Sequence, residues 1–136
     1  MEKSHDTLTD LHHGTPAWFV WSARLLPVGI LSQFLSAGLG LFQNPAMLGL
    51  HGGVGSSLSA LALALLAGSL AIRRLRGLVW WAAAVTILYT VQIGLAAGGN
   101  PLPLAFHPVN GALLLVASLV LVTKIERRRA AGLVPA

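Results

Sequence analysis

The sequence predicts an all-α integral membrane protein, a four-transmembrane-helix bundle built from two repeated helical hairpins. Two observations lead to this prediction: the stretches 25–72 and 77–123 contain no charged residue, and a 56-residue repeat relates their motifs. Hydrophobic residues make up 55% of the 136 residues and charged residues 10%, and the mean hydropathy is +0.75. Soluble domains carry about 25% charged residues. The composition therefore excludes a soluble enzyme or DNA-binding domain.

Each uncharged stretch is long enough for two membrane spans of roughly 20 residues. The turn-forming residues Gly, Asn and Pro gather at 43–45 and 98–103, near the middle of each stretch. The spans must be helical, because lipid offers no partner to unpaired backbone groups. We expect a transmembrane domain over 17–125, with cytoplasmic polar tails at 1–16 and 126–136. Its four helices are expected at about 18–42, 45–72, 78–98 and 101–123.

The basic residues predict the orientation. They cluster between the second and third helices and after the fourth, at Arg73, Arg74, Arg76, Lys124, Arg127, Arg128 and Arg129. The positive-inside rule then places both termini in the cytoplasm, in a multi-pass protein of the bacterial inner membrane. The indole rings agree, because they fall at the same predicted boundary: Trp18, Trp21, Trp80 and Trp81. The net charge of +5 thus reflects topology and predicts no nucleic-acid partner.

A shift of 56 residues superimposes the motif Asn-Pro-x5-His-x3-Gly on itself, with ten identities over positions 38–65. Parallel repeats of this kind are related by an axis along the membrane normal. Asn44 and Asn100 are predicted N-caps, each followed by a proline at the first helical position. His51 and His107 would then lie roughly 10 Å below the ends of their helices, at 1.5 Å per residue. In a four-helix bundle the second and fourth helices can face each other across the core.

Pro108 complicates the second copy of the motif. A residue before proline disfavours the helical conformation, so His107 is expected in a distorted turn and the fourth helix could restart there.

Ionisable residues inside a membrane are functional candidates. Two neutral imidazoles can supply both axial positions of a haem iron, which makes His51 and His107 candidate metal ligands. The chain has no cysteine, so the haem would be non-covalent haem b. Gly55 and Gly111, one turn beyond each histidine on the same face, would clear the flat macrocycle.

Four further polar residues are expected near the cofactor edge: Gln33, Gln92, Asn44 and Asn100. Packing roles for the glycines and hydrogen-bonding roles for the histidines and glutamines are the alternative. The predicted outer half has no cation to meet haem propionates.

Two short runs carry a family resemblance: Ser-Ala-Gly-Leu-Gly at 36–40 and His-Pro-Val-Asn-Gly at 107–111. Over about residues 20–125 the chain resembles the membrane cytochrome b bundles, especially one half of a haem A synthase. It also resembles small uncharacterised four-helix bacterial membrane proteins. The resemblance implies that His51 and His107 are axial ligands. The synthase chemistry does not carry over, because it uses two such units and a membrane carboxylate.

These observations favour a b-type haem protein for electron transfer or haem handling. Its partners are the lipid bilayer and either a quinone or a redox partner protein, and a homo-oligomer is compatible with the pattern. The alternatives are another polar site for a proton, metal or quinone, a non-redox accessory or binding subunit of a larger membrane complex, and a small proton-coupled carrier. An enzyme is the weakest reading, because no nucleophile–base pair is visible.

The orientation can be tested with a reporter fused after Arg129. We expect activity only from a reporter that works in the cytoplasm, because basic residues are retained on that side. Activity of a periplasmic reporter at this position would reverse the topology.

Overall fold

The computed structural model describes residues 14–131, and these residues form four long helices and one short one. The long helices are α1 (Ala17–Phe42), α2 (Ala46–Ala71), α3 (Val79–Ala97) and α4 (Pro101–Ala131), and a 3-10 helix, η2 (Arg73–Leu78), joins α2 to α3. Each long helix is long and apolar enough to cross a membrane. The predicted all-α, four-helix membrane bundle is confirmed, and the chain is a multi-pass membrane protein.

The largest departure from the expected boundaries is in α4, which continues to Ala131 instead of ending near 123. Its last turns are charged, and ion pairs support them: Glu126 pairs with Arg129 one turn later at 3.0 Å and with Arg24 of α1 at 2.7 Å. Nor does α4 restart at Pro108. The proline lies inside the continuous helix, so His107 is helical. Much of the two predicted polar tails, 1–13 and 132–136, lies outside the described residues.

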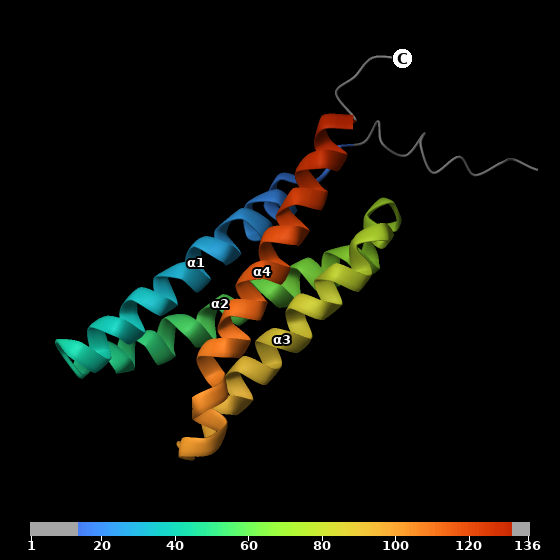
Figure 1. Cartoon of the computed structure of the whole chain (residues 1–136). Coiled ribbons are helices and arrows are strands. Elements are labelled where there is room, and N and C mark those ends of the chain that lie inside the picture. Colours follow the sequence, from blue (N-terminus) through green and yellow to red (C-terminus); the bar gives the residue numbers. More distant parts are fainter. Residues whose placement is uncertain (1–13, 132–136) are drawn as a thin grey trace, which may run out of the picture.

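The helices form a ring in which consecutive helices are neighbours. Helix α1 packs on α2 and α4, and α3 packs on the same two helices, so α2 and α4 occupy opposite corners (Figure 1). We call the end with the turns at 43–45 and 98–100 the turn end. The opposite end, with η2 and the last turns of α4, is the basic end. Figure 1 shows the two hairpins diverging towards the turn end.

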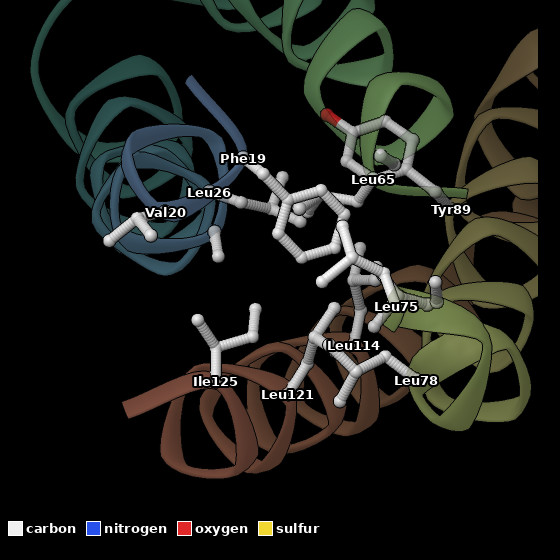
Figure 2. Close-up of a cluster of buried hydrophobic side chains, with 14 of the residues drawn as sticks. Phe19, Val20, Leu26, Leu65, Leu75, Leu78, Tyr89, Leu114, Leu121 and Ile125 are labelled. Carbon is white, nitrogen blue, oxygen red and sulfur yellow. The ribbon is translucent and has the colours of Figure 1, made fainter. Parts of the chain in front are cut away.

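The hydrophobic core lies in the half of the bundle towards the basic end. Phe19 and Leu26 of α1, Leu65 of α2 and Leu75 of η2 are fully buried there, against Leu121 of α4 (Figure 2). Fixed packing therefore joins the helices at the basic end and leaves room between the hairpins at the turn end.

Aromatic and basic side chains meet at the basic end, as expected for a membrane boundary. Arg24 lies 5.5 Å from the ring centre of Trp21, and Lys124 lies 4.9 Å from that of Trp81. Arg24 also bonds Glu126, so it ties α1 to α4 at this boundary.

One glycine allows α1 and α2 to approach closely beside the core. A Cβ atom at Gly68 would lie 2.6 Å from the Trp18 ring and 2.9 Å from the Phe19 ring. Trp18 is half exposed and could turn away, whereas Phe19 is fully buried and cannot. By contrast, a Cβ atom at Gly53 of the same helix would meet nothing within 4 Å.

Gly68 and Gly53 give a matched test of the packing between α1 and α2. Gly68→Ala should destabilise the bundle by about 1–3 kcal/mol through overpacking, whereas Gly53→Ala should be neutral or stabilising. Both variants gain the same helix propensity, so the difference in thermal unfolding in detergent isolates the contact with α1. Equal stability of the two variants would contradict this account of the interface.

Candidate functional site

A cavity of about 290 Å³ lies between the hairpins in the half of the bundle nearer the turn end, and all four long helices line it. Its volume is close to the lower limit for small-molecule sites, about 300 Å³. Six of the predicted site residues line it: His51, His107, Gln33, Gln92, Gly55 and Gly111. The remaining wall is mainly apolar and includes Ile30, Phe34, Ile93 and Leu114.

The structure brings the two histidines together across this cavity. Their ring centres are 6.0 Å apart, with an angle of 63° between the ring planes. A metal–imidazole bond of about 2.0 Å, with about 1.1 Å from nitrogen to ring centre, gives about 6.2 Å between two imidazoles on opposite sides of one ion. The observed distance between ring centres is close to this value, and the two rings lie edge to face.

Both rings are held through Nδ1 by backbone carbonyls. His107 Nδ1 lies 3.1 Å from the carbonyl oxygen of Gln92, and His51 Nδ1 lies 3.1 Å from that of Gln33. A carbonyl only accepts, so each Nδ1 carries the hydrogen and donates it. The other nitrogen, Nε2, then keeps its lone pair as a potential ligand. Metal-binding histidines are oriented in this way.

The two glutamines extend the repeat beyond the sequence motif. Gln33 and Gln92 are 59 residues apart, whereas His51 and His107 are 56 apart. The difference of three residues is close to one helical turn, so both glutamines present a carbonyl to the histidine of their own hairpin. An alignment at 56 residues does not superimpose them, which hides this relation in the sequence.

The space beside the two glycines is filled by glutamine side chains. A Cβ atom at Gly55 would lie 3.0 Å from Gln33 Oε1, and one at Gly111 would lie 3.1 Å from Gln92 Nε2. The clearance expected for a macrocycle is thus taken up by two amides, each at the far end of a flexible side chain.

Asn44 and Asn100 lie outside the cavity lining. Their Oδ1 atoms accept hydrogen bonds from the backbone N–H groups two residues further on, those of Ala46 at 3.0 Å and Leu102 at 3.2 Å. Asn100 directly precedes α4, as predicted, whereas α2 begins at Ala46 with Pro45 in the N-cap position, so Asn44 lies one residue before the predicted place. The structure gives no contact between either asparagine and the cavity.

Three polar residues near the cavity were not assigned from the sequence. Tyr89 donates to the Gly55 carbonyl at 2.6 Å, and Ser36 Oγ lies 3.2 Å from His51 Nδ1. Asn110, only 8% exposed, donates to Leu88 O at 2.9 Å and to Gln92 Oε1 at 2.7 Å. A polar side chain in an otherwise apolar span is the sequence signal that could have identified these residues, but the sequence does not reveal their hydrogen-bond partners.

Within residues 14–131, no cluster of three or more His, Cys, Asp or Glu side chains could hold a metal ion. A metal site built on the histidine pair therefore needs another group to fill the remaining coordination positions.

Residues 33–99 are similar to a family of unknown function (DUF6220). The match covers just under half of the chain and includes Gln33, His51 and Gln92, but ends before His107. No curated protein and no solved structure matches the chain.

Proposed function

We propose that the protein binds one haem b in the membrane, with His51 and His107 as its axial ligands, and serves in electron transfer or haem handling. The observation that carries the proposal is the histidine pair: two rings 6.0 Å apart, on opposite corners of the bundle, each with its Nδ1 held by a carbonyl. When bound, haem supplies an iron that accepts and releases one electron.

The number of protein ligands supports a porphyrin over a bare ion. Structural zinc sites take four protein ligands and catalytic zinc sites take three. The cavity offers two imidazoles, and the described residues add no further cluster of ligands. A porphyrin needs only two axial ligands, because its four nitrogens fill the other positions.

The cavity walls suit an apolar macrocycle with some rearrangement. The lining is mainly apolar, and Gln33 and Gln92 are half-buried with their amides against Gly55 and Gly111. These amides would have to turn aside to admit a ring. The lining contains no Lys or Arg, so the propionates would need the open side of the cavity and water.

The proposed location follows from the basic end. If the arginines of η2 lie in the cytoplasm of a bacterium, both termini lie there too and the cavity lies in the outer half of the inner membrane. Electrons would then be exchanged with a quinone in the bilayer or with a partner protein at the outer surface.

The ligand assignment is tested by purifying the protein with adequate haem. We expect about one haem per chain and a six-coordinate, low-spin spectrum with a sharp α-band on reduction. His51→Ala and His107→Ala should each abolish the low-spin spectrum and weaken haem binding at least about 100-fold, or about 2.7 kcal/mol.

Ser57→Ala is the matched control on α2, because Ser57 is exposed and bonds only the Gly53 carbonyl of its own helix. It should retain the wild-type spectrum. A colourless wild type that takes up no added haemin would overturn the proposal and leave a non-redox accessory subunit as the leading function.

The glycines test whether the cavity admits a ring. Gly55→Leu and Gly111→Leu should each weaken haem binding about tenfold or more, about 1.4 kcal/mol, because a large side chain would occupy the space that the glutamine amides can vacate. Haem titration of the purified variants measures this. The double variant Gly55→Leu with Gln33→Ala separates two causes of weaker haem binding. Restored haem binding in the double variant would show that the leucine acts only by displacing the Gln33 amide. Unchanged haem binding in both single leucine variants would refute the clearance argument.

A further inference from the structure

We propose that η2 is a binding site for the headgroup of an anionic phospholipid, with Arg73, Arg74 and Arg76 as the residues that bind its phosphate. The site lies at the basic end, away from the histidine cavity. The inference therefore goes beyond the proposed haem site and does not depend on it.

The arginines of η2 have no acidic partner in the part of the chain that the structure describes. Glu126 is the one carboxylate side chain within residues 14–131, and it pairs with Arg24 at 2.7 Å and with Arg129 at 3.0 Å. Lys124 lies over the Trp81 ring. By contrast, no hydrogen bond or ion pair within 14–131 engages the side chain of any η2 arginine. Three cations within four residues thus lack a counter-charge at salt-bridge distance.

Core packing fixes the turn that carries these charges. Ile72 ends α2 in an extended conformation, and its carbonyl accepts from the Leu75 N–H at 2.8 Å. Leu75 is fully buried and Leu78 is 5% exposed. Residues three apart share a face of a 3-10 helix, so the two leucines anchor one face, and Arg73 and Arg76 lie together on another. The backbone is thus ordered before a headgroup arrives, which lowers the entropy cost of binding.

Arg74, on the third face of η2, has a donor that lacks an acceptor. Its Nε is shielded from solvent and has no hydrogen-bond partner, although the side chain as a whole is partly exposed. Leaving such a donor unpaired is unfavourable. No bond has to break for the side chain to turn outward, where phosphate oxygens can accept from two nitrogens of the guanidinium fork. Gly77 shares this face and leaves space, because a Cβ atom there would meet nothing within 4 Å.

The surroundings of η2 favour a lipid over a free phosphate. Trp80 of α3, two residues after η2, is 77% exposed, and indole rings prefer the boundary between lipid and water. Exposed apolar side chains such as Leu70 continue along the adjoining helix α2. A phospholipid satisfies both surfaces, because its acyl chains cover the apolar helices while its phosphate meets the arginines. Basic residues beside a membrane span attract anionic lipids in this way.

The first experiment titrates the full chain, purified in a neutral detergent, with dioleoyl phosphatidylglycerol or dioleoyl phosphatidylcholine and counts bound lipids by native mass spectrometry. We expect one phosphatidylglycerol to bind at least about tenfold more tightly than phosphatidylcholine. Arg73→Gln and Arg76→Gln should each weaken its binding about fivefold. Arg127→Gln removes the same charge from an exposed position of α4 and should bind like the wild type. Equal losses in all three variants would show attraction to net charge alone and overturn the site.

The second experiment separates the guanidinium of Arg74 from its charge and the lipid from its phosphate. Arg74→Lys keeps the charge but loses Nε and the fork, so phosphatidylglycerol should bind about tenfold more weakly. Wild-type affinity in this variant would overturn the role of Arg74. Glycerol phosphate in large excess should not displace the bound lipid. Displacement would identify a site for soluble phosphates and overturn the lipid assignment.

Thermal unfolding guards against variants that fold poorly, because each variant is compared with its own lipid-free value. Phosphatidylglycerol should raise the unfolding temperature of the wild type and of Arg127→Gln. It should not raise that of the triple variant with glutamine at 73, 74 and 76. A rise in the triple variant equal to that of the wild type would overturn the site. None of these outcomes bears on the haem proposal, which depends on His51 and His107 at the other end.

Discussion

The uneven distribution of side-chain volume along the helices determines this structure. Large apolar side chains such as Phe19, Leu65 and Leu121 fill the bundle at the basic end, where they are fully buried. Towards the turn end, six of the nine residues of α2 over 49–57 are Gly or Ser, and a cavity opens there between the hairpins. A void in a membrane bundle forfeits dispersion contacts, which drive helix association in lipid. The packed end must therefore hold the open end in place.

Polar contacts between the hairpins reinforce the packing where it gives way to the cavity. Tyr89 of α3 donates to the Gly55 carbonyl of α2. Nearer the basic end, Thr86 of α3 donates to the Ala62 carbonyl of α2 at 3.3 Å. At the basic end, Arg24 and Glu126 join α1 to α4. Interhelical hydrogen bonds in membranes each contribute about 0.6–2 kcal/mol. Together they fix the depth at which the hairpins part, and so the place where the two imidazoles face each other.

Much of this architecture follows from the sequence, because charge-free stretches and turn residues determine membrane helices locally. The repeat also indicates that His51 and His107 share one depth. The extension of α4 was missed, because its charged last turns depend on Arg24, a partner 102 residues away. The roles of the Gln33 and Gln92 carbonyls were missed because every residue has a carbonyl, and only three-dimensional packing selects which one meets a histidine. Asn110 stands in a noted motif, but its two acceptors on α3 are set by helix register.

The groups that orient the histidines are neutral, and this suits their surroundings. A carboxylate would orient an imidazole more strongly, but burying its charge in an apolar setting is costly unless it is paired. Backbone carbonyls are already present in every helix and add no charge to the membrane interior. Gln92 offers such a carbonyl, and its side chain accepts a hydrogen bond from Asn110. Gln33 offers the same acceptor but shares it with Ser36. The two copies of the repeat thus orient their imidazoles through the same kind of neutral acceptor and differ in the polar side chains that surround it.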